Sequence, residues 1–599
     1  MNLVTQAYRQ WGIASIMGVL VIAVNVLAAP GVDVSTRDTV LARQATEYEK
    51  ETSKTILELQ QFRSTESLVV EGGGNLHGTA TLINLSPQIN TWFLLTLDWG
   101  TPDGHLTYHL ENPSPREQSI HLSTADFGIQ IGSGNQSTGC RLWSGIAAGP
   151  LDDARRSSLP YAPLCDGRLF LRNRAAGRYT ALEWTSEFLR NHVWGGEAIV
   201  GIVRKGFFTD RFVEKGTVAP PSAPATSGPA EPNRPMVAAL DSSKSYGQVA
   251  PQNLGIDVGQ SMNSVAPGRW YAASGVAGVY AGFIQPQIIS SEILESYPGV
   301  VNRLDSVEAG ALDYLVAFDL ADFDLGFALG TDHPGVGWSD RPPREMRDAL
   351  PGPDGIRTAA PLVSNGMISP ALADRTVATF VGGFKREHGA FRYGAFAKQN
   401  RGTHYGFVEQ GVVFSKLLPG LATLYVLDDG TVEMKTWTDA DKILLPRIKF
   451  ARQNGVPLIE RDATTGTSRP GSLVARWGPG NWSGSADEEL RSLRAGACLQ
   501  ETSTKRFLIY GYFSTATPSA MTRVFQAYNC KYALHLDMNA PELTYLALYL
   551  HKGNQLQVEY LVRAMADSDK QTDRGPLLRF LIRPDNRDFF YLMQRETPK

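Results

Sequence analysis

The stretch that decides the fold begins at Arg506-Phe-Leu-Ile-Tyr-Gly-Tyr512, continues through Thr517-Pro518 and ends at Tyr532-Ala-Leu-His-Leu536. Both apolar runs are typical of buried strands. Thr517 and Pro518 supply an N-cap and a proline at the first helical position, after which apolar side chains recur at helical spacing. The stretch predicts a strand, a helix and a second strand, which normally form a right-handed crossover between parallel strands.

Polar residues follow the end of the second strand. Asp537 comes directly after Leu536, and Asn539 and Glu542 are close behind. Polar groups just past the C-terminal end of such a strand are well placed to meet a ligand. Asp537 is therefore a candidate ligand-binding carboxylate, and the alternative is a turn-starting aspartate that caps the next segment.

The sequence resembles the phosphodiester glycosidase family in five segments that occur in the family's order. These segments are Phe380-Val-Gly-Gly-Phe384, Leu424-Tyr-Val-Leu-Asp-Asp-Gly-Thr-Val432, Ala451-Arg-Gln-Asn454, Arg491-Ser-Leu-Arg-Ala-Gly496 and Asn529-Cys-Lys-Tyr-Ala-Leu-His-Leu-Asp537. The resemblance covers about residues 265 to 560. It implies a family-like fold and cleavage of the bond between a sugar and a phosphate.

The resemblance also implies a set of site residues. Gly382 and Gly383 match the family's Asn-Gly-Gly-Phe segment, Arg491 and Arg494 its Arg-Thr-x-x-Gly segment, and Asp537 its Leu-Asp-Gly-Gly-Gly-Ser segment. An arginine suits a phosphodiester because its guanidinium can hold two phosphate oxygens at once. We assign that role to Arg491.

In this assignment the catalytic residues are Asp537, Arg491 and Glu542. Asp537 would stabilise an oxocarbenium-like centre or handle a proton, with Glu542 or His535 as the second group. The residues assigned to substrate binding are Arg494, Gly382, Gly383, His535, Asn539, Asp332 and His333.

Asp332 and His333 belong to a second polar cluster, the loop that runs from Thr331 to Pro342. Its mixture of Asp, His, Trp and Arg suits the stacking of a sugar ring and the binding of its hydroxyls or of a phosphate. The alternative is a long ordered turn. Lys385 begins a third polar loop, which is expected to be a solvated surface.

The motifs depart from the family pattern at two places. Val381 stands where the family has Asn, and Met538-Asn-Ala540 replaces the glycines after the aspartate. Methionine adds a large side chain where the family's backbone approaches its ligand. A second hypothesis is therefore a non-catalytic envelope protein, in which the glycosidase fold binds a glycan or another protein.

Composition and charge limit the classes of function. The 599 residues include 57 Lys and Arg against 60 Asp and Glu, which gives a net charge of −3. This balance argues against a nucleic-acid partner, because phosphate contacts need a basic excess. The 58 glycines and 35 prolines predict many turns, as β-rich domains require.

The N-terminal region predicts export. No charged residue occurs from Trp11 to Val32, so residues 1–32 are expected to be a signal peptide or a membrane anchor. The two alternatives remain open. Residues 36–64 have apolar side chains near heptad spacing and predict a helical stalk. The rest of the chain is then expected to be periplasmic, extracellular or anchored facing outside the cytoplasm.

Beyond the stalk, the sequence predicts two domains. Residues 67–215 alternate apolar and polar side chains with frequent turns, as in an all-β sandwich or jelly roll. Residues 216–250 contain a run rich in Pro, Ala and Ser and are expected to form a linker. Residues 252–599 are expected to form an α+β phosphodiester-glycosidase-like domain with a mixed β-sheet.

The four cysteines lie in two close pairs, Cys140 with Cys165 and Cys498 with Cys530. Two local disulfides are the simplest arrangement, although four cysteines allow three pairings. No cysteine has the spacing of a metal site, so no metal or other cofactor is expected, while a divalent ion near Asp537 stays an open alternative. The expected partners are a sugar phosphate or glycan, and a membrane if the N-terminal segment is retained.

Overall fold

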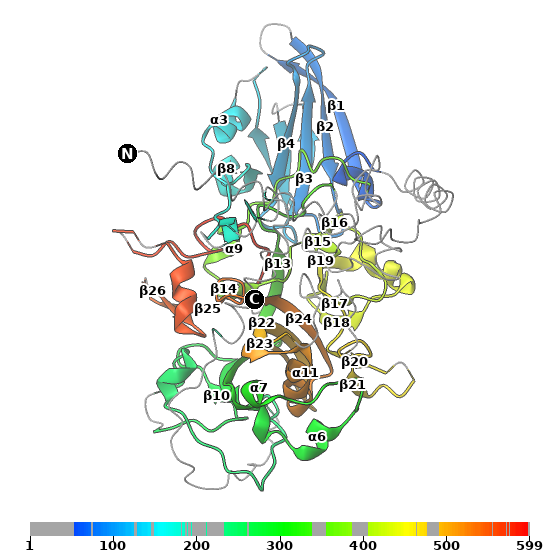
Figure 1. The fold of residues 1–599 in the computed structure, drawn as a ribbon. Coiled ribbons are helices and arrows are strands. Elements are labelled where there is room, and N and C mark those ends of the chain that lie inside the picture. Colours follow the sequence, from blue (N-terminus) through cyan, green and yellow to red (C-terminus); the bar gives the residue numbers. More distant parts are fainter. Residues whose placement is uncertain are drawn as a thin grey trace, which may run out of the picture. The chain divides into compact units, whose positions relative to one another are not determined.

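The structure of the chain is a computed structural model (Figure 1). It describes residues 53–72, 76–124, 128–144, 146, 149–180, 183–185, 188–189, 193, 211, 233–259, 263–337, 355–385, 405–462, 464–475, 490–553, 555–570, 572–573 and 575–596. The membrane segment predicted within residues 1–32 lies outside these ranges. Among the described residues, no helix is both long enough and apolar enough to cross a bilayer.

The N-terminal part forms two antiparallel sheets, with strand orders β1-β2-β3-β4-β9-β8 and β5-β6-β7. The strands of the larger sheet are β1 (Ser64–Gly72), β2 (Leu76–Asn84), β3 (Trp92–Asp98), β4 (His105–Glu111), β8 (Tyr161–Leu164) and β9 (Leu169–Arg172). The smaller sheet contains β5 (Gln118–Ser123), β6 (Gly128–Ser133) and β7 (Gln136–Arg141). Helix α3 (Pro150–Arg156) and the short 3-10 helix η2 (Cys165–Gly167) flank β8.

Strand β3 is covered on both faces. Phe93, Leu95 and Leu97 pack into a core that includes the apolar side chains of the smaller sheet. Trp92 and Leu94 pack instead into the main core of the chain. Because successive side chains of a strand point to opposite faces, this double burial explains the continuous apolar run of β3.

The rest of the described chain forms three further sheets, of eight, five and five strands. The eight-stranded sheet has the order β10 (Tyr271–Ala272), β11 (Val279–Ile284), β12 (Asp313–Asp319), β23 (Arg506–Ala516), β22 (Ser492–Glu501), β24 (Tyr532–Met538), β20 (Ile459–Arg461) and β21 (Ser468–Pro470). One five-stranded sheet has the order β13 (Phe323–Ala328), β27 (Phe589–Gln594), β14 (Thr376–Val381), β25 (Leu546–Lys552) and β26 (Gln555–Tyr560). The other has the order β16 (Val412–Ser415), β15 (Phe407–Glu409), β19 (Ile448–Gln453), β17 (Ala422–Leu427) and β18 (Val432–Thr436).

Helices in this part are short. The α-helices are α6 (Ser291–Glu295), α7 (Ser306–Gly310), α9 (Pro370–Ala373) and α11 (Pro518–Ala527). The 3-10 helices are η4 (Pro251–Leu254), η5 (Pro286–Ile288), η6 (Asp439–Arg447) and η7 (Arg563–Ser568).

The prediction of an α+β domain with a mixed sheet is wrong, because every ladder between the named strands is antiparallel. The predicted strand, helix and strand are present as β23, α11 and β24. Strand β22, however, lies between β23 and β24 and pairs antiparallel with both. The two strands therefore run in the same direction without being neighbours.

Helix α11 begins at the predicted N-cap. The Thr517 hydroxyl accepts a hydrogen bond of 3.1 Å from the Ala520 amide, and Pro518 is the first helical residue. The helix packs beside β23 and β24 (Figure 1). A Cβ atom on Gly496 of β22 would lie 2.8 Å from Met521 Cε of the helix. Glycine at this position therefore allows the helix to approach the sheet closely.

The central strands of the eight-stranded sheet separate two cores. Leu499, Leu508 and Leu534 pack into the main core. Their chain neighbours Cys498, Ile509 and Ala533 pack into a second core, which also contains the apolar side chains of α11. Both faces of β22, β23 and β24 are thus buried, and the site described below forms where β24 ends.

The end of the predicted stalk lies within the compact unit formed by residues 52–599. Most of residues 36–64 lies outside the described residues. The described end is not a continuous helix, because Ile56–Leu59 forms a single 3-10 turn, η1, and β1 begins at Ser64. Ile56 is fully buried in the main core. The apolar spacing here therefore reflects packing against the core.

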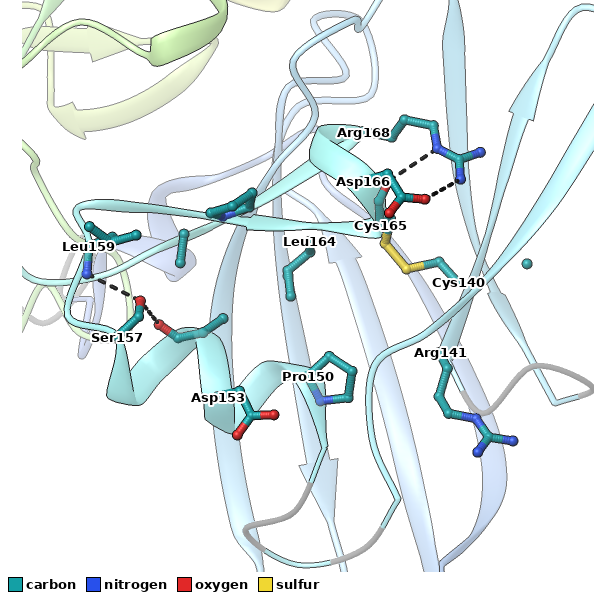
Figure 2. A pocket seen from close by; sticks show the side chains of 14 residues that line it. Cys140, Arg141, Pro150, Asp153, Ser157, Leu159, Leu164, Cys165, Asp166 and Arg168 are labelled. Carbon is teal, nitrogen blue, oxygen red and sulfur yellow. Dashed lines mark hydrogen bonds and ion pairs between the residues drawn. A yellow bond between two sulfur atoms is a disulfide. The ribbon is translucent and has the colours of Figure 1, made fainter.

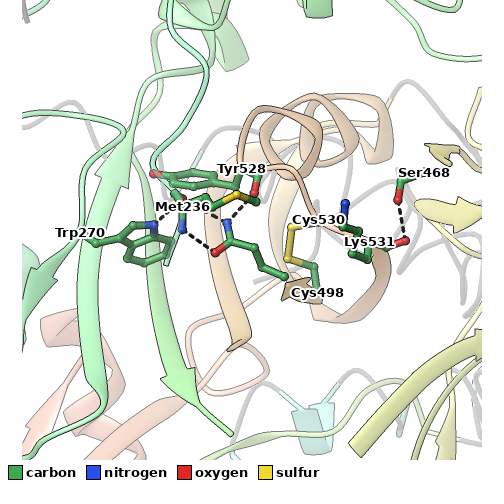
Figure 3. Close-up of a disulfide and its surroundings, with 8 residues drawn as sticks. Met236, Trp270, Ser468, Cys498, Tyr528, Cys530 and Lys531 are labelled. Atoms are coloured by element: carbon green, nitrogen blue, oxygen red, sulfur yellow. Dashed lines mark hydrogen bonds between the residues drawn. A yellow bond between two sulfur atoms is a disulfide. The ribbon is translucent and has the colours of Figure 1, made fainter. Parts of the chain in front are cut away.

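The described part of the predicted linker, residues 233–250, is also a packed part of this unit. The Met236 amide donates to Gln500 Oε1 at 2.7 Å, and the Met236 carbonyl accepts from Trp270 Nε1 at 2.9 Å (Figure 3). Ala238 and Tyr246 are buried in the second core. The run rich in Pro, Ala and Ser that predicted the linker lies outside the described residues.

Both local disulfides favoured by the cysteine spacing are present, Cys140–Cys165 and Cys498–Cys530. Cys498 lies in β22 and Cys530 lies between α11 and β24, so the second bridge ties the end of the helix to the sheet (Figure 3). Disulfides of this kind are typical of proteins that fold outside the reducing cytoplasm.

We expect loss of the Cys498–Cys530 bridge to lower stability. The bridge closes a loop with a sequence separation of 32 residues. Removing such a crosslink should cost about 3–4 kcal/mol through the added freedom of the unfolded chain. The Cys498→Ala/Cys530→Ala variant should therefore unfold at lower urea concentration than the unchanged protein. Reductant should lower the urea concentration at which the unchanged protein unfolds by more than it does for the variant. Equal decreases would contradict this prediction.

Candidate functional site

Asp537 is buried at the end of β24. Its Oδ2 accepts a hydrogen bond of 3.0 Å from Arg587 Nη1, and its Oδ1 accepts one of 2.9 Å from the Met538 amide. Burial raises the pKa of Asp537 to about 6, although Arg587 acts in the opposite direction. This carboxyl group can therefore gain and lose a proton near neutral pH.

Arg587 joins Asp537 to a second carboxylate. Its Nη2 lies 2.8 Å from Glu183 Oε1, which belongs to the segment that follows β9. The Arg587 side chain is only 3% exposed. Burial alone would raise the pKa of Glu183, but Arg587 and Lys385 outweigh burial and lower it to about 2. One guanidinium thus holds two carboxyl groups with opposite pKa shifts.

Lys385 completes what we call the charged cluster, which consists of Asp537, Arg587, Glu183, Lys385 and Asp332. Lys385 Nζ lies 3.0 Å from Glu183 Oε1 and 3.2 Å from Asp332 Oδ2. The expectation that Lys385 lies on a solvated surface is wrong, because its side chain is 3% exposed. A lysine so deeply buried requires nearby negative charge, and both carboxylates supply it.

The Tyr179 ring covers this lysine. Lys385 Nζ lies 4.7 Å from the ring centroid, and the Tyr179 hydroxyl donates a hydrogen bond to Asp332. Tyr179 and Glu183 both come from the segment after β9. The segment after β9 therefore contacts the charged cluster through two of its side chains, Tyr179 and Glu183.

His333 belongs to a second group of buried polar side chains, which adjoins the charged cluster. His333 Nδ1 pairs with Asp588 Oδ1, and Arg452 Nε donates to Asp588 Oδ2 at 2.7 Å. Burial would raise the pKa of Asp588, but Arg452 and His333 lower it to about 2. Asp588 follows Arg587 directly, so the two groups of charges adjoin.

Asn454 holds the end of β14 against β24. Its Nδ2 donates to the Leu536 carbonyl at 2.9 Å, and its Oδ1 accepts from the Phe384 amide at 3.2 Å. A Cβ on Gly383, which has φ +144°, would lie 2.8 Å from Asn454 Oδ1. Gly382 donates its amide to the Asp588 carbonyl at 2.8 Å. The two glycines predicted for the site thus lie beside it: Gly383 leaves room for Asn454, and Gly382 forms a backbone hydrogen bond with Asp588.

Arg491 lies immediately before β22, and its guanidinium pairs with Asp305, the N-cap of α7. The guanidinium observed on Asp537 is that of Arg587. The arginine beside Asp537 therefore comes from the loop before β27, and not from the segment of Arg491 and Arg494 to which we assigned this role from the sequence.

Arg494 is fully buried and bound by backbone. It donates to the carbonyls of Ala516 at 2.7 Å and Leu490 at 2.9 Å. Its Nη1 also lies 3.3 Å from His535 Nε2 and 3.4 Å from Met538 Sδ. Burial, and after it Arg494, lowers the pKa of His535 well below its usual range, so its ring is neutral. Met538 thus packs against the arginine of the motif.

Asn539 and Glu542 lie in the turn after β24. Asn539 adopts φ +86°, and its Oδ1 accepts from Ser492 Oγ at 2.7 Å. Glu542 Oε1 accepts from Thr180 Oγ1 at 3.4 Å, beside the segment that carries Glu183. The structure therefore places the Glu542 carboxylate against Thr180, three residues before Glu183 in the chain, and Asn539 in a stabilised turn.

Sequence reasoning missed Glu183, Arg587 and Asp588. The last two belong to the polar run Asp585-Asn-Arg-Asp588, directly before an apolar strand. Charges at a strand boundary are a signal that could have found them. No local pattern marks Glu183, because its partners lie far away in the sequence.

Several buried polar atoms near the charged cluster have no hydrogen-bond partner among the residues described. They are Thr331 Oγ1, His333 Nε2 and Asn586 Oδ1. Such atoms usually meet water or a ligand. Within the same ranges, no group of three His, Cys, Asp or Glu side chains is arranged to hold a metal ion.

A separate pocket of about 590 Å³ lies in the N-terminal part. Its wall includes the Cys140–Cys165 disulfide, Arg168 and Leu159, and no member of the charged cluster lines it (Figure 2). Arg168 turns toward Asp166, with an ion pair of 3.6 Å between them. The pocket is therefore distinct from the candidate site.

The chain matches no known family model, and no curated protein is similar to it. Among solved structures, the catalytic domain of zebrafish N-acetylglucosamine-1-phosphodiester alpha-N-acetylglucosaminidase, auto-inhibited by its pro-peptide, aligns at 11% identity with a TM-score of 0.26. The alignment covers 55% of this chain and 88% of that domain.

Two further structures align with similar scores. A hypothetical protein from Synechocystis has 9% identity and a TM-score of 0.27, and the alignment covers 91% of this chain and 100% of that one. A protein from Burkholderia pseudomallei described as exported has 10% identity and a TM-score of 0.19, with 47% and 74% covered.

The raised pKa of Asp537 predicts a pH effect on stability. Folding raises this pKa from 3.8 to about 6, so between these values the folded state keeps a proton that the unfolded state has released. The contribution of Asp537 to the free energy of unfolding therefore falls as pH rises through this interval, by up to about 3 kcal/mol. Urea unfolding of the unchanged protein and of Asp537→Asn at several pH values should show this difference. A pH-independent difference would rule it out.

Proposed function

We propose that the protein is an exported hydrolase that cleaves the bond between a sugar and a phosphodiester. The observation that carries this proposal is the contact between a titratable carboxyl, Asp537, and Arg587, at 3.0 Å. The same guanidinium and Lys385 converge on one carboxylate oxygen. An acid with a pKa near 6 thus lies next to Arg587, which together with Lys385 can hold an anionic oxygen.

The reaction would break the bond between the anomeric carbon and the phosphate oxygen. The electron pair stays on the phosphate oxygen, and water supplies a hydroxyl to the anomeric carbon. Asp537 would take or give the proton in this exchange, because its pKa of about 6 fits both protonation states near neutral pH. Glu542, whose carboxylate accepts a hydrogen bond from Thr180, is the further carboxylate proposed for proton transfer.

In this proposal Arg587 and Lys385 take the phosphate-holding role that the sequence assigned to Arg491. The Arg587 guanidinium can donate two parallel hydrogen bonds to phosphate oxygens, and the Lys385 ammonium can donate a single one. His535 is not proposed as a proton donor, because its buried ring is neutral. It would act instead through its contact with Arg494.

The proposed location rests on the apolar segment within residues 1–32 and on the two disulfides. An exported enzyme would meet a phosphodiester in an envelope polymer or an extracellular glycan. The N-terminal sheets would then serve as a binding or spacing module.

The second candidate is a non-catalytic envelope protein that binds a glycan or another protein. The specific observation in its favour is Met538, whose Sδ lies 3.4 Å from Arg494 Nη1. This side chain fills space beside the motif arginine. In this alternative the charged cluster would serve to hold the fold together.

We expect Asp537→Asn to reduce turnover of sugar phosphodiesters by about a hundredfold or more, because the variant cannot transfer a proton. Arg587→Lys should lose activity mainly through weaker substrate binding, because lysine keeps the charge without the fork. The assay measures reducing sugar released from a panel of sugar 1-phosphodiesters by the full chain. Circular dichroism would confirm that each variant is folded.

A matched control is Arg506→Ala, which removes an arginine that pairs with Glu433 and Glu501 elsewhere on the surface. This variant should keep its turnover. Unchanged turnover in Asp537→Asn would end the hydrolase proposal. Glycan binding by calorimetry without any sugar release by the unchanged protein would instead support the second candidate.

A further inference from the structure

We propose that Lys385, Arg587 and Asn586 form a site for an external phosphate group, and that Glu183 occupies this site as an internal competitor. The inference rests on the proposed function and deepens it, because it names the group that substrate must displace. In the present structure the chain supplies its own anion to its own site.

Three donors converge on a single oxygen of Glu183. Oε1 lies 3.0 Å from Lys385 Nζ, 2.8 Å from Arg587 Nη2 and 2.9 Å from Asn586 Nδ2. Two of these donors carry full charges, and both side chains are only 3% exposed. A buried set of two cations and an amide around one oxygen matches the donors that a phosphate oxygen accepts.

The donors and the acceptor come from different parts of the chain. Lys385 follows β14, and Asn586 and Arg587 precede β27, whereas Glu183 belongs to the segment after β9. That segment fits closely, since a Cβ on Gly177 would lie 2.6 Å from the Asn586 amide nitrogen. The cations are thus fixed by the sheets of the C-terminal part, and the carboxylate is brought to them from outside those sheets.

Charge balance favours exchange with a phosphodiester. Lys385 and Arg587 face Glu183, Asp332 and Asp537, and Asp537 is the member whose pKa lies near 6. When Asp537 is protonated, two cations face two carboxylates. A phosphodiester carries one negative charge, as the Glu183 carboxylate does, so the exchange would keep the two cations balanced.

Polar atoms beside the oxygen can serve a larger ligand. Asn586 Oδ1 and Thr331 Oγ1 are buried and have no hydrogen-bond partner among the described residues. A carboxylate cannot donate a hydrogen bond to Asn586 Oδ1. A hydroxyl group on the sugar of a sugar phosphodiester can. The site therefore holds acceptor capacity that Glu183 leaves unused.

The test uses Glu183→Gln in the full chain, with inorganic phosphate as the probe. Glutamine keeps the shape of the side chain and removes its charge, which takes one anionic contact away from Lys385 and one from Arg587. We expect the variant to unfold at a lower temperature and to be restored by phosphate. Its affinity for phosphate should exceed that of the unchanged protein by about tenfold or more, measured by calorimetry.

Four controls define the result. Sodium chloride at equal ionic strength should restore little, and acetate tests whether a carboxylate can replace phosphate. Glu433→Gln, which removes a carboxylate paired with Arg506 elsewhere, should gain no phosphate affinity. Adding Lys385→Met to Glu183→Gln should abolish the gain. If Glu183→Gln does not fold, Glu183→Asp, which retracts the carboxylate, should show a smaller gain.

Absence of any gain in phosphate affinity in both Glu183 variants would overturn the inference and leave Glu183 with a purely structural role. A gain in phosphate affinity without sugar release by any variant would support the phosphate site and contradict the hydrolase proposal. The failure of one can therefore be distinguished from the failure of the other.

Discussion

The need to pair buried charge governs the centre of this protein. Arg587 contacts Asp537 at 3.0 Å and Glu183 at 2.8 Å, and a single uncompensated charge at such depth would cost several kcal/mol. Lys385 meets the same requirement by contacting Glu183 and Asp332. These contacts join the end of β24, the residues after β14 and the loop before β27. The site is therefore an electrostatic junction between two sheets of the C-terminal part.

The same requirement extends to the N-terminal sheets. Arg172 of β9 stacks on Trp92 with its Cζ 3.9 Å from the ring centroid, pairs with Glu111 at 3.6 Å and donates to Asn365 Oδ1 at 2.8 Å. Burial raises the pKa of Glu409 to about 8, against the effect of Arg172. Arg172 thus has an anionic partner in Glu111, whereas burial favours the neutral form of Glu409, and the segment that carries Glu183 follows the end of β9 in the chain.

The sequence was informative where the pattern is local. The N-cap at Thr517, helix α11 and strands β23 and β24 follow from spacing, and the two disulfides are the simplest of the three pairings that four cysteines allow. The antiparallel sheet order does not, because β22 enters between β23 and β24 from an earlier part of the chain. Asp537 could be singled out by its place after a strand, whereas Glu183 and Arg587 owe their roles to contacts that no local pattern encodes. Apolar periodicity predicts elements, but pairing of distant charges depends on tertiary structure.

The residues that flank Asp537 bear on the direction from which a ligand can reach it. On one side, Met538 packs its sulfur against Arg494, which also donates to two backbone carbonyls and contacts His535 Nε2. Moving Met538 away from this side would expose the buried guanidinium of Arg494. On the other side, Arg587 connects Asp537 to Glu183 Oε1, which also contacts Lys385 and Asn586, and donors of these kinds can also bind a phosphate oxygen. A ligand of Asp537 is therefore expected to enter along the Arg587 and Lys385 side, by displacing a side chain rather than by opening the core.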